Sequence, residues 1–217
     1  MRLYIYDTQE ARHARHDEDE GFGPIAAAGT HRLAVNGLAA LHRGLAQLVR
    51  EGKTFDRVLW MTHGSPGWVA FGKEGISSAV LDSASFKGQG YEKLFPKPTK
   101  MYFSGCEVAA DIDTPVVAMR DAGWRFLESV GRVFLHAGGY TMGWTSKGWG
   151  WNDGLSRFFL GGHSLHFSGS VRHVTFARGG RVLERLSYNT DILGGDSIFT
   201  IAKVALRLKA AGPDAGD

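Results

Sequence analysis

Four short apolar runs, separated by polar or amphipathic stretches, dominate the pattern of this chain. They cover residues 3–6, 57–63, 100–105 and 140–145. Short runs of this kind predict strands buried on both faces, which is typical of a parallel sheet. Apolar residues recur at helical spacing over 31–50 and 116–136, so we expect a helix in each range, packed on the faces of that sheet. This alternation predicts an α/β three-layer sandwich with a mostly parallel central sheet.

Weaker patterns complete the expected fold. Residues 171–176 and 181–186 flank Arg178-Gly179-Gly180, which predicts a C-terminal β-hairpin, and 197–211 reads as a final amphipathic helix. We expect a turn over 64–67, a short strand over 68–72 and exposed loops over 10–29 and 146–154. The stretch 73–98 is irregular, and the one helix expected there covers 85–95. Because no repeat or linker interrupts the pattern, we treat residues 1–217 as a single domain.

Composition and charge exclude several classes of function. A chain of 217 residues with 43% hydrophobic residues is long enough for one large α/β domain with a substantial core. Its net charge of +3, from 25 basic and 22 acidic residues, is too balanced to predict nucleic-acid binding. No apolar run approaches the roughly 20 residues of a membrane helix, and residues 1–7 do not form a signal-peptide core. We therefore expect a cytoplasmic protein with no membrane partner, unless export needs no N-terminal signal.

Cysteine and histidine usage narrows the chemistry further. Cys106 is the only cysteine, which excludes an intramolecular disulfide and a cysteine-based zinc site, and which suits a reducing compartment. His163, His166 and His173 have no carboxylate at a matching spacing, so we predict no metal site. No motif predicts a cofactor.

Two of the apolar runs end at residues that can perform catalysis. One run leads into His63 and another leads into Cys106. Parallel strands usually present chemistry at their C-terminal ends, and a thiol beside an imidazole is the minimum for nucleophilic catalysis. Gly64 can bring its N–H close to a carbonyl, and Gly105 permits a sharp exit that exposes the sulfur. We expect the two side chains to lie within hydrogen-bond distance of each other, either directly or through one bridging water.

These two segments also carry a resemblance to a known family. Residues 63–67 read His-Gly-Ser-Pro-Gly, and 104–109 read Ser-Gly-Cys-Glu-Val-Ala. Caspases likewise place the histidine about 50 residues before the cysteine. Over residues 57–145 the chain resembles the clan CD cysteine peptidases, which include caspases, gingipains, separases, legumains and CHAT domains. The wording of both motifs is similar to that of bacterial caspase-like domains of unknown function.

The resemblance implies a caspase-haemoglobinase-like fold and a cysteine endopeptidase. His63 would be the general base, Cys106 the nucleophile, and the N–H groups of Gly64 and Cys106 the oxyanion hole. The caspase motif Gln-Ala-Cys-Arg-Gly is absent, so caspase-type Asp specificity is not implied. No third member of a triad is assigned.

Other interpretations of the same residues stay open. A lone cysteine is often a small buried hydrophobe, and a His before Gly is often a turn residue. A non-catalytic binding module, or an amidase or acyltransferase acting on a small molecule, would fit. For a peptidase we expect a protein or peptide substrate, with Trp144, Trp149 and Asp153 as candidates to line its groove. The sequence does not predict the oligomeric state.

Overall fold

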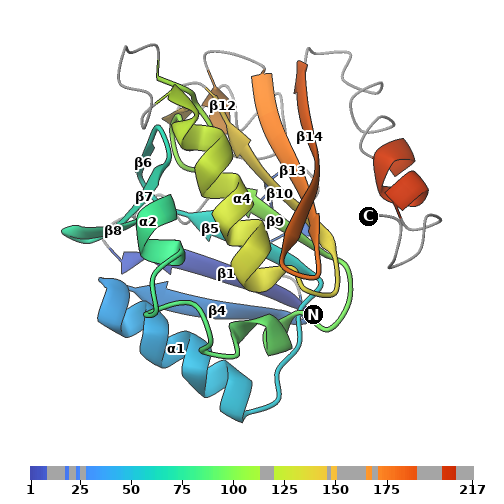
Figure 1. The fold of residues 1–217 in the computed structure, drawn as a ribbon. Helices are drawn as coiled ribbons and strands as arrows, with labels where there is room; N and C mark the ends of the chain where they lie inside the picture. The colour runs from blue at the N-terminus through green and yellow to red at the C-terminus, as the bar shows by residue number, and fades with distance from the viewer. Residues whose placement is uncertain are drawn as a thin grey trace.

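A computed structural model of the chain describes residues 1–8, 18–19, 23–24, 28–112, 120–145, 148–150, 165–167, 171–189 and 202–208. Its centre is a seven-stranded sheet (Figure 1). Across the sheet the strands are β4 (Thr30–Val35), β1 (Arg2–Asp7), β5 (Arg57–Met61), β9 (Thr99–Phe103), β10 (Gly139–Trp144), β13 (Val171–Arg178) and β14 (Arg181–Asn189). The first five are parallel, whereas β13 and β14 form an antiparallel hairpin beside β10. The predicted mostly parallel sheet and C-terminal hairpin are therefore confirmed.

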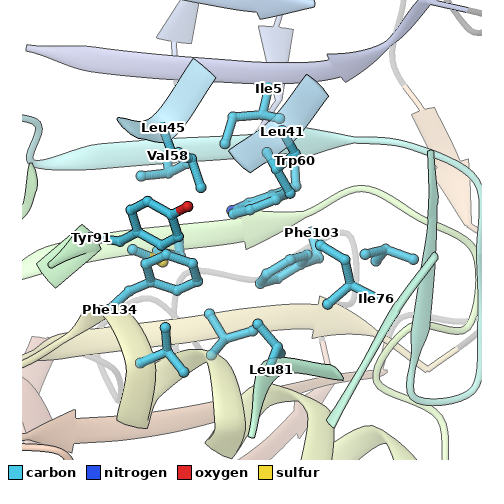
Figure 2. Close-up of a cluster of buried hydrophobic side chains, with 14 of the residues drawn as sticks. Ile5, Leu41, Leu45, Val58, Trp60, Ile76, Leu81, Tyr91, Phe103 and Phe134 are labelled. Atoms are coloured by element: carbon cyan, nitrogen blue, oxygen red, sulfur yellow. The ribbon is translucent and has the colours of Figure 1, made fainter. Parts of the chain in front are cut away.

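Alternation along the strands sends side chains to two separate cores. On one face the sheet contributes Leu3, Ile5, Val58, Trp60, Met101 and Phe103. This face is covered by α1 (Leu38–Arg50), α2 (Ser78–Leu81), the 3₁₀ turn η2 (Tyr91–Leu94) and α4 (Ala122–Phe134), as Figure 2 shows for part of the cluster. On the opposite face, Tyr4, Leu59 and Tyr102 belong to a second cluster, to which the helix over 202–208 contributes Val204 and, less buried, Leu208. These layers are consistent with a three-layer α/β sandwich, with both long helices on the same face.

The first predicted helix begins later than expected. Residues 30–35 form strand β4, paired in parallel with β1, and α1 starts only at Leu38. Leu33 and Val35 alternate with exposed neighbours, which is the period of a strand and not of a helix. No side chain of its own segment caps α1. Instead, the Leu38 N–H donates to Glu74 Oε2 at 2.5 Å.

The stretch predicted as irregular holds more structure than expected. It holds β8 (Glu74–Ser77), which joins a small antiparallel sheet with β6 (Gly64–Ser65) and β7 (Trp68–Phe71) at the end of β5 (Figure 1). The short strand expected over 68–72 is confirmed as β7. The helix expected over 85–95 is wrong, because the structure has α2 before it and only the single turn η2 inside it. Ser77 explains the early helix, since its hydroxyl accepts the Val80 N–H as an N-cap.

Several predicted elements are described only in part. The helix expected over 116–136 is seen as α4, which ends at Phe134, and its residues 116–119 lie outside the described residues. A strand, β11 (Gly148–Gly150), occurs inside the predicted loop 146–154 and pairs with β12 (Leu165–Phe167). Within 10–29, β2 (Glu18–Asp19) pairs with β3 (Gly23–Pro24). None of the described helices is long and apolar enough to cross a bilayer.

Candidate active site

The two predicted catalytic residues follow strands β5 and β9 and lie at the C-terminal ends of these neighbouring strands. The strands are parallel, with Trp60 opposite Phe103. The pairing continues one residue beyond β9, where the Ser104 N–H donates to the Trp60 carbonyl at 3.0 Å. The segments that carry His63 and Cys106 therefore leave adjacent strand ends in the same direction, as the apolar runs predicted.

The two segments are in direct backbone contact. A Cβ built on Gly64 would lie 2.8 Å from the Cys106 carbonyl oxygen, and one built on Gly105 would lie 3.2 Å from the Gly64 Cα. Neither glycine has room for a methyl group unless its neighbours shift. Glycine at both positions is thus what allows the His63 and Cys106 segments to approach this closely.

Neither of the two candidate catalytic residues is buried. His63 is exposed, and Cys106 is half-buried and forms no disulfide. A buried structural cysteine would be shielded from reagents, so this exposure is the first requirement of a nucleophile. The hydrogen bond between imidazole and thiol remains a prediction.

The turn after Cys106 contains a strained residue. Glu107 has a φ of +54°, and it is the one non-glycine residue with positive φ among those the structure describes. The left-handed region costs a side chain about 1–2 kcal/mol. The turn is closed by the Ala110 N–H, which donates to the Glu107 carbonyl at 2.8 Å. Such strain persists only where the surroundings over-determine the backbone, and it is frequent at active sites.

The chain beyond this turn is held on several sides. Val108 and Ala109 are fully buried. The Val108 carbonyl accepts the Gly67 N–H at 3.0 Å, and the Ala109 N–H donates to the Trp144 carbonyl at 2.9 Å. From α4, the Gly123 N–H donates to the Ala110 carbonyl at 3.1 Å. The loop of Cys106 is therefore fixed by the His63 hairpin, by β10 and by α4 together.

The structure describes the three residues predicted to line a substrate groove to different extents. Trp144 ends β10 with a half-buried side chain, and its carbonyl supports the Cys106 loop through Ala109. Trp149 lies on β11, and Asp153 lies outside the described residues. Trp144 is thus placed next to the site. The groove itself remains a prediction.

The sequence interpretation overlooked Asp7, which supports the His63 side. Asp7 ends β1 and is 2% exposed, and its Oδ2 accepts the Gly72 N–H at 2.6 Å. Gly72 directly follows β7, and the Ala70 N–H of that strand donates to the His63 carbonyl at 2.9 Å. The carboxylate therefore anchors the strand that holds His63. The sequence did contain a signal for this residue, because Asp7, like His63 and Cys106, comes at the end of an apolar run.

A second overlooked group lies under the Cys106 loop. The rings of His173 and Trp124 stack with centroids 3.9 Å apart and planes inclined by 11°. Burial lowers the pKa of His173 to about 4, a hydrogen bond with the Ala109 backbone opposes this shift, and the Arg185 charge adds to it. The sequence singled out His173 only as a weak metal ligand, because its contact with Trp124 depends on the tertiary fold.

Charged residues surround this stacked pair. Arg185 lies 5.3 Å from the Trp124 ring centroid and forms an ion pair with Glu128 at 2.5 Å. Burial raises the pKa of Asp111, and the Asp121 charge raises it further, whereas hydrogen bonds from Trp124 and the Arg185 charge lower it. In the part of the chain that the structure describes, no three His, Cys, Asp or Glu side chains are grouped to hold a metal ion.

Neither protein-family models nor curated proteins match the chain. Its function therefore has to be argued from the site and not from the fold. The site combines a half-buried cysteine, a neighbouring histidine segment and a constrained loop at the C-terminal ends of two parallel strands.

Proposed function

We propose that this chain is a caspase-like cysteine endopeptidase, in which His63 and Cys106 hydrolyse peptide bonds of protein substrates. The observation that carries the proposal is the backbone contact between Gly64 and the Gly105-Cys106 segment. The mostly parallel seven-stranded sheet is consistent with the caspase-haemoglobinase-like fold that belongs to this proposal. Because a chain with a single cysteine and no disulfide suits a reducing compartment, we propose that the enzyme acts in the cytoplasm.

In the proposed mechanism, His63 takes the thiol proton and Cys106 Sγ attacks the carbonyl carbon of the scissile bond. The carbonyl oxygen becomes an oxyanion, which accepts hydrogen bonds from the N–H groups of Gly64 and Cys106. His63 then gives its proton to the leaving amine, and a thioester remains on Cys106. Water, deprotonated by His63, attacks the thioester to release the carboxylic acid and restore the thiol.

The pairing of β6 supports the role given to Gly64. The bond from the Ala70 N–H to the His63 carbonyl makes Gly64 and Val69 a non-hydrogen-bonded pair of the hairpin. The Gly64 N–H is therefore not used by β7 and points away from it. This direction leaves the group available to a carbonyl that approaches from the other side of β6.

The same geometry favours an extended peptide as substrate. In the small sheet β6-β7-β8, β6 is an edge strand of the described structure, and it directly follows His63. A peptide added to this edge would gain main-chain hydrogen bonds and place a carbonyl beside the Gly64 N–H. Strand addition thus combines substrate binding with the proposed oxyanion contact.

The test is a digest of a denatured proteome in which new protein N-termini are mapped. Wild type should produce fragments that neither Cys106→Ala nor His63→Ala produces, because both steps of the mechanism need both side chains. Cys106-dependent hydrolysis of small amides without cleavage of proteins would point instead to an amidase or acyltransferase. Absence of any Cys106-dependent product, together with an unreactive thiol, would point to a non-catalytic binding module.

A further inference from the structure

We infer that His173 is a positioning residue for Cys106, which it holds in place through the backbone of Ala109. The inference rests on the proposed function, because it concerns the loop that carries the proposed nucleophile. His173 lies on β13, far from Cys106 in the sequence, and the sheet brings its strand beside β10. The residue is thus a further point of support for the site, in addition to the His63 hairpin, β10 and α4.

The surroundings of His173 are unusual for a residue that only fills space. Its side chain is 9% exposed, it lies flat against Trp124, and its Nδ1 has no hydrogen-bond partner among the described residues. A buried nitrogen without a partner loses its hydration and gains nothing in return. A phenyl ring would fill the same stack without that loss, so the polar ring needs another explanation.

The other ring nitrogen supplies this explanation. His173 forms a hydrogen bond with the backbone of Ala109, and this bond favours the proton on the ring. The Ala109 carbonyl is therefore the acceptor. Since Nδ1 has no partner, we assign the proton of the neutral imidazole to Nε2. Burial keeps the ring neutral near pH 7, because it lowers the pKa to about 4.

Ala109 is confined on the remaining sides. It is fully buried, and its N–H donates to the Trp144 carbonyl at 2.9 Å. A Cβ built on Gly143, which lies opposite His173 in the sheet, would be 3.1 Å from the Ala109 Cβ. A Cβ built on Gly123 would be 2.1 Å from the Ala109 oxygen. His173 therefore completes a set of contacts in which Ala109 has little freedom to move.

The strained turn couples Ala109 to Cys106. Between them the backbone passes through Glu107 at positive φ, and the turn is closed by the bond from the Ala110 N–H to the Glu107 carbonyl. A turn this short and constrained cannot absorb a shift of Ala109 by itself. A displacement of about 1 Å at a reacting group can slow a reaction roughly a hundredfold. The hydrogen bond from His173 is thus placed where it can set the position of the sulfur.

Two substitutions separate positioning from packing. His173→Phe keeps the ring on Trp124 and removes both nitrogens, whereas His173→Gln loses the ring and keeps an N–H donor. For each variant we would measure amide hydrogen exchange at Ala109, the rate of Cys106 alkylation by iodoacetamide, and kcat and KM for a cleaved protein. His136→Phe is the matched control, since exposed His136 also bonds a backbone carbonyl, that of Arg132, but far from Cys106.

Positioning predicts a definite ranking of the variants. Exchange protection at Ala109 and the rate of Cys106 alkylation should both be highest in wild type, lower in the Gln variant and lowest in the Phe variant. Alkylation of the Phe variant should be slower than that of wild type by roughly tenfold or more. In the Phe variant kcat should fall while KM and the melting temperature stay close to wild type. The ranking of wild type, then Phe, then Gln would overturn the inference, because it would mean that His173 acts through packing alone.

Two further outcomes are also decisive. If the Phe variant does not fold, His173→Leu replaces it, and wild-type exchange at Ala109 in the Leu variant would overturn the inference. Amide exchange needs no catalytic activity. An absence of Cys106-dependent cleavage by wild type would therefore overturn the proposed function, while a loss of protection at Ala109 in the Phe variant would still support the role of His173 in holding the loop.

Discussion

The two halves of the proposed site are held in different ways. On the cysteine side, Val108 and Ala109 are fully buried and are contacted by α4, β10 and the ring of His173. On the histidine side, His63 is exposed and its carbonyl is held by β7, a strand of a small separate sheet. The loop of the proposed nucleophile is thus tied to the core of the protein, whereas the proposed base is carried by a peripheral hairpin.

Because of this difference, we expect substitutions on the two sides to affect stability and Cys106 reactivity in different proportions. A change beneath Cys106 disturbs buried backbone, so it should lower the free energy of unfolding and the reactivity together. A change beneath His63 disturbs only a hairpin and its anchor, so it should lower the reactivity more than the stability.

The largest effect is expected for Gly123→Ala, on the cysteine side. The new Cβ would meet backbone, 2.1 Å from the oxygen and 2.2 Å from the carbon of the Ala109 carbonyl, so α4 or the Cys106 loop must move. We expect the free energy of unfolding in urea to fall by about 3 kcal/mol, and Cys106 alkylation to slow as well. The control is Gly44→Ala, another helical glycine, whose Cβ would meet only the flexible Leu33 side chain. Equal losses in both variants would contradict the account.

Acid should weaken the cysteine side through His173. Its pKa is about 4 in the folded protein and about 6.5, the ordinary value, in the unfolded chain. Between these two pH values the imidazole is protonated in the unfolded chain but not in the folded protein. Stability contributed by the neutral ring is present above about pH 6.5 and is lost as the pH falls toward 4. We expect a loss of about 2 kcal/mol in urea unfolding between about pH 7 and pH 4.5.

The matched variant for this pH effect is His173→Gln, which cannot titrate. Asp111 works in the opposite direction, because its raised pKa lets the folded protein bind that proton first, but it does so in both proteins. The difference between wild type and the Gln variant therefore isolates His173. An identical loss of stability in the two proteins on acidification would remove His173 as its source.

On the histidine side, Asp7→Asn should change reactivity more than stability. The substitution removes the charge from the group that accepts the Gly72 N–H, so we expect the free energy of unfolding to fall by only about 1.5 kcal/mol. Cys106 alkylation should nevertheless slow, since β7 no longer holds His63 in register. Asp56→Asn is the control, because exposed Asp56 pairs with the N-terminus at the opposite edge of the sheet. An alkylation rate equal to wild type would show that Asp7 does not support His63.

The smallest effect is expected for Glu107→Gly. Glycine relieves the positive φ, a gain of about 1 kcal/mol that the greater freedom of the unfolded glycine chain partly cancels. The melting temperature should therefore stay the same or rise slightly. Glu51→Gly, at a residue with a φ of −78°, should lower it. A clear loss of stability in the Glu107 variant would mean that the side chain of Glu107 has a structural role.

The sequence predicted those parts of the fold that depend on local pattern. Short apolar runs indicated the parallel strands and the ends that carry His63 and Cys106. Gly179 and Gly180, which have φ values of +58° and +73°, marked the turn of the hairpin. Residues 30–35 were misassigned because Leu33 and Val35 fit the period of a strand as well as the spacing of the helix that follows. The pairing with β1 decides between the two, and it is not local.

The supports of the site were beyond sequence reasoning for a related reason. Asp7 and Gly72 lie on different elements, and so do His173 and Trp124, and each pair meets only once the sheet has formed. A single sequence gives no measure of which polar residue will be buried beside which ring. The candidate catalytic residues were visible because each follows an apolar run. Asp7 also ends such a run, but a single sequence does not show that its carboxylate meets Gly72.

The central claim, that His63 activates Cys106, is tested most directly by the rate of iodoacetamide alkylation near neutral pH. Cys106 is the only cysteine, so incorporated label reports on this thiol alone. Because the thiolate is the reactive species, wild type should react faster than a free thiol, and His63→Ala should slow the reaction roughly tenfold or more. Equal alkylation rates in wild type and His63→Ala would contradict the account.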